Sequence, residues 1–365
     1  MKKLLIVTHI SFWQKRGGDA ARLFALAQYL RKFTELTVVF GGYIDPIEFP
    51  MVEQIKKGMD FVWIKGKKDQ ELSDYAQPFI EFLSGRQFDV CIIEHVFLSF
   101  LIPFIPRHVK LILDAHDIVT DRMESFKKMN IRIKLLTDLS AEQENAYFRK
   151  FDVVMMIKKN DYDKVSKIVG KEKTLLVPHP VSMQKSVIRT RVNTIGFIAS
   201  SYPPNVYAVN WFIERVWPLI EGQGVTFNIY GDVCGGVKVE SKSSVVMKGY
   251  VADQDQIYRE IDIAINPVKC GAGMKIKNIE ALGSGLPLVT TTHGAMGIED
   301  GIGCSFLVAD DEISFSTRIL SLIDDYDTRR RMGEEAYQYA LNNFSPDECF
   351  KPLLLEINKP KVLMS

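Results

Sequence analysis

The feature that most constrains the fold is a repeated alternation of short apolar runs with longer amphipathic segments. In the first half the apolar runs have the length of buried strands, and helix-length patterns such as DAARLFALAQYLRKF separate several of them. The runs are LLIVTHI, LTVVFGG, VCIIEH, LILDAH, VVMMI and TLLVP. This alternation predicts an α/β domain whose parallel sheet is covered by helices on both faces.

The same alternation restarts after the polar stretch MQKSVIRTRVN. Its apolar runs are TIGFIAS, TFNIYGD, SVVMKGY, DIAINP, LPLVTT and SFLVAD. We therefore expect two doubly wound α/β domains, over residues 1–185 and 190–345, followed by a C-terminal segment 346–365 that contains one more helix of undetermined packing. Ligands of such sheets lie beyond the carboxyl ends of the strands, which makes a cleft between the domains the expected site.

Composition narrows the class of protein. The chain has 46 basic and 45 acidic residues, so its formal net charge of +1 predicts no general attraction to nucleic acid, and any anion site must be local. The five cysteines lie far apart without metal-site or redox spacing, which favours reduced thiols and a cytoplasmic location. The first apolar run is too short for a signal peptide, and the longest, VFLSFLIPFIP, is too short to cross a bilayer.

Residues 270–292 read CGAGMKIKNIEALGSGLPLVTTT and lie between two expected strands. Gly271 and Gly273 permit a tight turn, and a helix beginning at about Lys275 would direct free N–H groups toward that turn. Lys275 and Lys277 then stand in the first helical turn, where a cation opposes the helix dipole unless an anion offsets it. The segment predicts a phosphate-binding helix start.

Glu280 lies at the edge of the apolar face of the same helix. A carboxylate there can accept two hydrogen bonds from a ribose diol, or it can form an ordinary helix pair with Lys277. Gly283 and Gly285 are expected to end the helix. The GxGxxG fingerprint is absent, which disfavours a nicotinamide dinucleotide.

The run NPVKCGAGMKIKNIEALGSGLPLVTTTHGAMGI closely resembles the nucleotide-sugar-binding segment of retaining GT-B glycosyltransferases of family 4, also called group 1, in the branch with a GAG loop. The positions on that pattern are Lys269, Gly271, Gly273, Lys275, Lys277, Glu280, Ala281, Gly285, Pro287 and Thr290. GFIASSYPPNVYAVNWF and GYVADQDQIYREIDIAINP resemble neighbouring donor-domain segments in the expected order.

The resemblance implies a GT-B fold and a role for each matching position. Glu280 would hold the ribose, and His116, Lys277 and Glu280 would form the catalytic set. The implied donor and phosphate site comprises Lys269, Gly271, Ala272, Gly273, Met274, Lys275 and Lys277, and the implied nucleobase site comprises Gly249, Tyr250 and Val251. The donor is a substrate; no cofactor is expected, and no metal, since no carboxylate cluster has metal-ligand spacing.

Two departures from the family pattern matter. Many members carry a glutamate where this chain has Ala272, and many carry an arginine and a lysine where it has Ser200, Ser201 and Tyr202. Neutralisation of a diphosphate would then depend on the three lysines, at positions 269, 275 and 277.

In the first half, Gly17 and Gly18 separate the first strand from the first helix, with Asp19 as the expected N-cap. The resemblance gives this pair a donor role as the family's N-terminal GG loop. His116 and Asp117 follow the run LILDAH, at a strand end where side chains reach a ligand. His116 matches a family histidine near the donor sugar, whereas Asp117 and His95, at another strand end, are weaker acceptor candidates.

Two other features are less specific. His179 in VPHPV is interpreted as structural. The stretch ESFKKMNIRIKLL interleaves Lys127, Lys128, Arg132 and Lys134 with apolar residues, which fits either peripheral contact with an anionic membrane or a solvated helix; the apolar residues form no single stripe, and this favours the solvated helix.

The sequence thus predicts transfer of a sugar from a nucleoside-diphosphate sugar to a hydroxyl acceptor, with retention of anomeric configuration implied by the resemblance. Family analogy points to a glycan or lipid-linked glycan of the bacterial surface as acceptor. The alternatives are a nucleotide-sugar epimerase or hydrolase on the same fold, and a non-catalytic nucleotide-sugar-binding subunit, motivated by Ala272 and the missing basic pair. Nothing in the sequence indicates the base, the sugar, the linkage or the oligomeric state.

Overall fold

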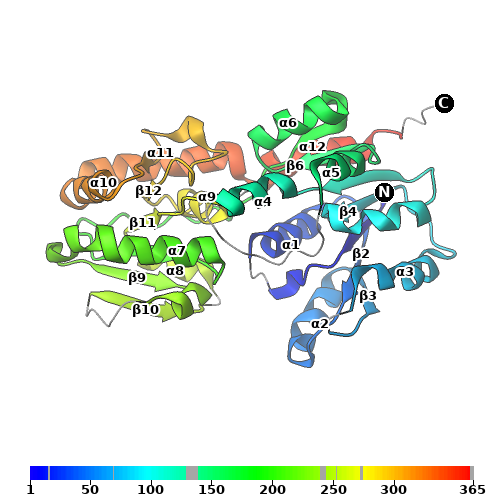
Figure 1. Cartoon of the computed structure of the whole chain (residues 1–365), viewed down its shortest axis with the longest axis horizontal. Coiled ribbons are helices and arrows are strands. Elements are labelled where there is room, and N and C mark those ends of the chain that lie inside the picture. Colours follow the sequence, from blue (N-terminus) through cyan, green and yellow to red (C-terminus); the bar gives the residue numbers. More distant parts are fainter. Residues whose placement is uncertain are drawn as a thin grey trace. The chain divides into compact units, whose positions relative to one another are not determined.

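The computed structural model describes residues 1–14, 17–68, 70–128, 139–238, 244–251, 253–271 and 274–361. The chain forms two compact units, each with its own parallel sheet. The first contains the described residues of 1–124, 133–178 and 349–365, and the second those of 125–132 and 179–348. Two Rossmann-like α/β units are the predicted fold class, which the structure confirms (Figure 1).

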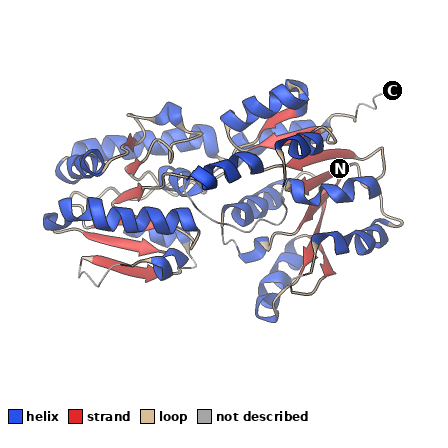
Figure 2. Ribbon diagram, in the orientation of Figure 1, coloured by secondary structure: helices blue, strands red, loops and turns tan. Residues whose placement is uncertain are grey.

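The first sheet has seven described strands in the order β3-β2-β1-β4-β5-β6-β7, all parallel. They are β1 (Lys3–Thr8), β2 (Glu35–Gly42), β3 (Asp60–Lys65), β4 (Val90–Glu94), β5 (Lys110–Asp114), β6 (Val153–Met156) and β7 (Thr174–Leu176). The helices of this unit are α1 (Gly18–Leu30), α2 (Phe49–Gly58), α3 (Ala76–Leu83), α4 (Val119–Lys128, which continues into the second unit), α5 (Ala141–Phe148), α6 (Lys159–Val169) and α12 (Pro346–Asn358). The central strands β4 and β5 are buried along their whole length, as expected of a sheet covered on both faces (Figure 2).

The C-terminal helix α12 belongs to the first unit, which its sequence pattern did not determine. Lys110 Nζ, at the start of β5, lies 2.8 Å from Glu356 Oε1. The rings of Tyr29 and Phe350 lie 5.3 Å apart. The last helix of the chain therefore completes the packing of the first domain.

The second sheet has six described parallel strands in the order β10-β9-β8-β11-β12-β13. They are β8 (Thr194–Ile198), β9 (Thr226–Tyr230), β10 (Val245–Gly249), β11 (Ile263–Asn266), β12 (Leu288–Thr290) and β13 (Leu307–Val308). The helices are α7 (Pro203–Trp211), α8 (Gln254–Glu260), α9 (Ile276–Gly283), α10 (Glu312–Asp324) and α11 (Tyr326–Phe344). A buried aromatic cluster, in which the rings of Phe212 and Phe227 lie 4.7 Å apart, joins the helices to the sheet.

In each sheet the order in which successive strands are added reverses once. β1 has β2 on one side and β4 on the other, and β8 lies in the same way between β9 and β11. At such a switch point the loops at the carboxyl ends of the two central strands diverge and leave room for a ligand. The loops after β1 and β4, and those after β8 and β11, are therefore where functional side chains are expected.

The fold also bears on the cysteines, on one expected helix and on membrane spans. The five cysteines are free thiols, as predicted. The expected helix AVNWFIERVWPLI begins as α7 but continues as a π-helical segment, Phe212–Val216, before Pro218. Within the described ranges, no helix combines the length and the hydropathy needed to span a membrane.

Candidate functional site

In the second unit, the loop after β11 turns at Gly271 and leads into α9. Gly271 has φ +97°, a left-handed conformation that favours glycine, and α9 begins at Ile276 with Lys275 at its N-cap. The Gly271 carbonyl accepts a hydrogen bond from Lys275 Nζ at 3.1 Å and lies 2.6 Å from His293 Nε2. The predicted helix start is present, and two side chains brace the turn before it.

Lys277 occupies the first turn of α9, and neutral groups hold it. Its Nζ donates to Asn205 Oδ1 at 2.8 Å and lies 4.6 Å from the centre of the Phe197 ring. Burial is the main cause that lowers the pKa of Lys277 to about 7, and the nearby Lys275 adds to it. The described contacts of this amine are thus with an amide and a phenyl ring, and not with a carboxylate.

Glu280 lies one turn further along α9, and its carboxylate is hydrogen-bonded to a residue of helix α8. The Tyr258 hydroxyl donates to Glu280 Oε2 at 2.8 Å. Burial raises the pKa of Glu280, while the hydrogen bond from Tyr258 and the charge of Lys277 oppose that rise. One carboxylate oxygen is thus fixed by a phenol, and acceptor capacity remains for a ligand's hydroxyl groups.

The other predicted donor residues lie around this helix start. Lys269 Nζ lies 3.6 Å from the centre of the Trp211 ring, and burial lowers its pKa. Met274 is half-buried beside the N-cap. Ala272 and Gly273, the remaining part of the predicted GAG loop, lie outside the described residues.

The predicted nucleobase residues follow β10. Gly249 ends this strand with φ +68°, and its carbonyl accepts a hydrogen bond from the Gly231 N–H at 2.7 Å. Tyr250 is 51% exposed, and Val251 is half-buried. β10 lies at the edge of the sheet, two strands away from β8.

In the first unit, the fold brings two buried carboxylates together. Glu94 and Asp114 are the last residues of β4 and β5 and are register partners, so their side chains share one face of the sheet. Arg22, fully buried on α1, donates to both carboxylate oxygens of Asp114 at 2.9 and 3.1 Å. A bidentate pair of this kind neutralises Asp114 inside the domain.

The two predicted histidines follow these strand ends with strained backbones. His95 and His116 have φ values of +63° and +62°, which non-glycine residues rarely adopt. Their rings stack with centroids 4.1 Å apart, and His116 Nε2 lies 2.8 Å from Glu94 Oε2. Strain at adjacent strand ends is typical of functional sites and persists only where surrounding contacts enforce it.

The ionisation of this cluster follows from its burial. Burial and the charge of Asp114 raise the pKa of Glu94 to about 7. Burial alone would lower the pKa of His116, but Asp114 and the contact with Glu94 outweigh it and raise that pKa. Burial lowers the pKa of His95 well below its ordinary value and that of His9 to about 4. Glu94 and His116 thus both bind a proton more tightly than they would in water, whereas the neighbouring His95 and His9 bind one less tightly.

Glu94, Asp114 and His116 also offer ligand atoms within 4.8 Å of one another, a spacing that suits a metal ion. The sequence showed no such cluster, because its members come from two strands. Both oxygens of Asp114 already pair with Arg22, so a guanidinium supplies the positive charge that this carboxylate needs. The network is thus closed around Asp114, whereas Glu94 Oε1 is buried without a hydrogen bond.

The remaining first-unit predictions are placed as follows. Asp117 is buried with Oδ2 3.2 Å from Arg122 and with Oδ1 lacking a hydrogen bond. Gly17, with φ +88°, is the N-cap of α1 and Gly18 its first residue, so the prediction that Asp19 caps this helix is wrong; Asp19 lies in the first turn. His179 is buried. Lys127 and Lys128 end α4, whereas Arg132 and Lys134 lie outside the described residues.

Sequence reasoning missed several polar residues of these two regions. They are Arg22, Asp114, Asn205, Tyr258 and His293. Asp114 and His293 were accessible to it, because both end or closely follow a recognisable strand. The other three lie on helices, and only the packing of those helices brings their side chains to the strand ends.

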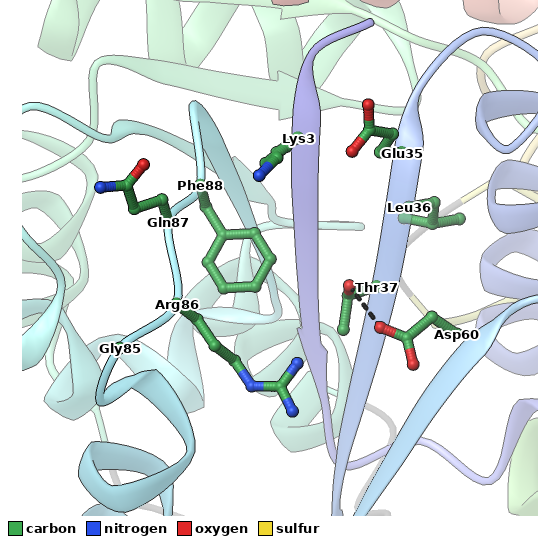
Figure 3. Close-up of a pocket in the computed structure, with 9 residues that line it drawn as sticks. All are labelled: Lys3, Glu35, Leu36, Thr37, Asp60, Gly85, Arg86, Gln87 and Phe88. Carbon is green, nitrogen blue, oxygen red and sulfur yellow. Dashed lines mark hydrogen bonds between the residues drawn. The ribbon is translucent and has the colours of Figure 1, made fainter.

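A pocket of about 520 Å³ opens elsewhere in the first unit (Figure 3). Lys3, Glu35 and Asp60, the first residues of β1, β2 and β3, line it together with the loop 85–88 that precedes β4. It thus lies at the amino edge of the sheet, opposite His95 and His116. None of the predicted site residues lines it.

A known family model matches the larger part of the second unit. Residues 192–325 match the family model described as "Glycosyl transferases group 1". This range contains Lys269, Lys277 and Glu280. A curated relative, an uncharacterized 44.6 kDa protein in the cps region of Klebsiella pneumoniae, is 24% identical over 219 residues. That alignment covers 56% of this chain and 56% of the relative, so the chain spans about half the length of the curated relative it matches.

Solved structures resemble the whole chain. HepE of Anabaena, in complex with UDP and glucose, has a TM-score of 0.74 at 14% identity and covers 98% of this chain and 100% of its own. A mutant of TarM from S. aureus, in complex with fondaparinux, α-GlcNAc-glycerol and UDP, has a TM-score of 0.72 at 11% identity, with 98% and 100% covered. Sucrose-phosphate synthase of Thermosynechococcus elongatus has a TM-score of 0.72 at 10% identity, with 98% and 97% covered. The fold is GT-B, as the sequence predicted.

Proposed function

We propose that the protein is a glycosyltransferase that transfers a sugar from a nucleoside-diphosphate sugar to a hydroxyl group. The observation that carries the proposal is the group 1 match over residues 192–325, within which a glycine turn and two lysines stand at the start of α9, at the carboxyl edge of a parallel sheet. Backbone N–H groups and cations there suit a diphosphate leaving group, on which negative charge accumulates during transfer.

Individual roles follow from the contacts. Lys269, Lys275 and Lys277 would neutralise the diphosphate, Glu280 would accept hydrogen bonds from the ribose, and the residues after β10 would contact the base. In the first unit we propose that His116 contacts the donor sugar. His95 and Asp117 are proposed for the acceptor, whose specificity resides in loops. We further propose retention of anomeric configuration, as in the family that the sequence resembles, and no metal or cofactor.

A surface glycan or its lipid-linked precursor is the acceptor class we propose, since the Klebsiella pneumoniae relative lies in a cps region. A cytoplasmic location belongs to the same proposal, and contact of the basic end of α4 with the inner membrane face is the alternative to the solvated helix that the sequence favours.

The proposal is tested first by a thermal-shift screen against UDP-, GDP-, ADP- and dTDP-sugars. A ligand that binds only the folded protein raises the unfolding temperature, and we expect one base to do so, with UDP tried first because the HepE and TarM structures contain UDP. The binding donor is then incubated with and without glycan acceptors, and the anomeric configuration of the product is read by NMR.

Each other outcome has a definite meaning. Sugar release or a new nucleotide sugar formed without acceptor would indicate a hydrolase or an epimerase. Binding without turnover under any acceptor would favour a binding subunit, the reading that the alanine at position 272 motivates. No stabilisation by any of the four donors would contradict the proposed function.

A further inference from the structure

The contacts of the Lys277 amine suit both its neutral and its protonated form, so a bound ligand can change its charge. Its amine has two described neighbours, the amide oxygen of Asn205 at 2.8 Å and the ring of Phe197 at 4.6 Å. Both can accommodate a neutral amine as well as an ammonium, because an amine still donates a hydrogen bond to the amide oxygen. The cation-binding partners are thus weak compared with a carboxylate.

Asn205 is itself fixed in place. It lies in the first turn of α7, is 9% exposed, and donates through Nδ2 to the carbonyl of Ser200 at 3.1 Å and to its hydroxyl at 3.3 Å. These bonds orient the amide so that Oδ1 faces Lys277. The loop between β8 and α7 contains no basic residue, and the first turn of α7 instead presents an amide acceptor to a lysine of α9.

The polar groups around Lys277 come from three helices. On its own helix and N-cap, Glu280 favours the charged amine and Lys275 disfavours it. From α8, the Tyr258 hydroxyl lies 3.4 Å from the Lys277 carbonyl and bonds to Glu280, which directs that carboxylate's Oε2 to a phenol. α7 contributes the neutral Asn205. Burial dominates, and it lowers the pKa of Lys277 to about 7.

We propose that Asn205 is a positioning residue which holds Lys277 as a proton-accepting cation site, so that binding of a nucleoside-diphosphate sugar is coupled to the uptake of one proton by Lys277. The inference rests on the proposed function, because it assigns the diphosphate to this amine. An anion beside the amine stabilises the ammonium form and raises its pKa in the complex. Donor affinity consequently falls as pH rises above the pKa that Lys277 has in the free protein.

The coupling is measured by isothermal titration calorimetry with UDP-glucose, or with the GDP-, ADP- or dTDP-glucose that the screen selects. A nucleotide sugar is used because its diphosphate is esterified at both ends and lacks the second ionisation, near pH 6, of a terminal phosphate. Titrations at pH 8 in HEPES and Tris buffers, which differ in ionisation enthalpy and contain no phosphate to compete for the site, yield the protons taken up. We expect about 0.9 proton per donor at pH 8, and a Kd that weakens up to about 50-fold between pH 7 and pH 9.

Two variants separate the role of Asn205 from a general effect of charge. Asn205→Asp places a carboxylate beside the amine, which keeps Lys277 protonated before binding, so uptake at pH 8 should fall close to zero. Tyr207→Asp adds the same charge to the same helix at a position that is 50% exposed and two residues away, on another face. It should keep the wild-type uptake. Lys277→Arg, whose guanidinium does not titrate, should bind the donor without uptake.

The outcomes that contradict the inference are distinct. Binding of the donor by the wild-type protein without proton uptake overturns it while leaving the proposed function intact, and this measurement needs no variant to fold. Uptake by Asn205→Asp equal to that of the wild type removes the role of Asn205. Absence of binding of all four nucleotide sugars overturns the proposed function and this inference together.

Discussion

The carboxyl ends of the two sheets differ in how their charged side chains are paired. In the first sheet Asp114 meets Arg22 through two hydrogen bonds, and Glu94 meets His116, all of them buried. In the second sheet Lys277 meets an amide and a phenyl ring. The first arrangement pairs both carboxylates with basic side chains of the protein, with Glu94 Oε1 lacking a hydrogen bond, whereas the second places the Lys277 amine against neutral groups.

In the proposed transferase, this difference would separate two tasks. A buried, paired network stabilises one geometry, and it holds the histidine rings in strained positions that isolated strands would not adopt. Cations held by neutral groups keep their attraction for a phosphate, at some cost in stability to the free protein. We therefore expect equivalent substitutions in the two regions to have opposite consequences for stability and for donor binding.

The largest expected effect is on stability. Arg22→Met should lower the free energy of unfolding by about 3–5 kcal/mol, because it leaves Asp114 buried without its partner. Urea unfolding followed by fluorescence measures the loss. A double variant, Arg22→Met with Asp114→Leu, should recover part of it, and a single variant as stable as the wild type would show that the pair is not what holds this region together.

The same substitution at the other strand ends should act on binding. Lys277→Met should weaken binding of the nucleotide-sugar donor about 10- to 100-fold, as expected for a lost charge-assisted hydrogen bond, with little loss of stability. Calorimetric titration and thermal unfolding of one preparation provide both numbers. If the variant is strongly destabilised instead, the two regions do not differ as described.

A pH experiment tests the raised pKa values of Glu94 and His116 in the first region. The pKa of Glu94 is raised to about 7 from 4.5 and that of His116 is raised as well, so both groups bind protons more strongly in the folded than in the unfolded chain. Their stabilisation is present at low pH and is lost as pH rises through about 7. The stability difference between the wild type and Glu94→Gln should therefore shrink by up to about 2 kcal/mol from pH 5 to pH 8. Thermal unfolding at intermediate pH values measures this change, and a constant difference would show that folding does not raise the pKa of Glu94.

The smallest effect concerns Glu280. Tyr258→Phe removes the hydroxyl that fixes Glu280 Oε2 at 2.8 Å and should weaken donor binding about fivefold, equivalent to about 1 kcal/mol. The control ligand is a diphosphate without the nucleoside. Because it lacks the ribose, the wild type and Tyr258→Phe should bind it with equal affinity. Equal loss for both ligands would assign Tyr258 to the phosphates.

Much of the fold could be predicted from the sequence because parallel strands that are buried on both faces have continuous apolar sequences. β4 and β5 were recognised for this reason. β3 was missed, since DFVWIK lies at the edge of its sheet and only two of its six positions, Phe61 and Ile64, are buried. The glycine turn and the lysines before α9 were also recognisable, because they are contiguous and their spacing is local.

What the sequence by itself determined is thus the order of strands and helices and the contiguous chemistry of residues 270–292. Only the tertiary structure decided that Glu94 and Asp114 share a face, that Arg22 neutralises one of them, and that Asn205 meets Lys277 across 72 positions of sequence. Local patterns report which face of an element is buried. The partner of a buried polar group is set by strand register and helix packing, which bring distant residues to the same strand ends.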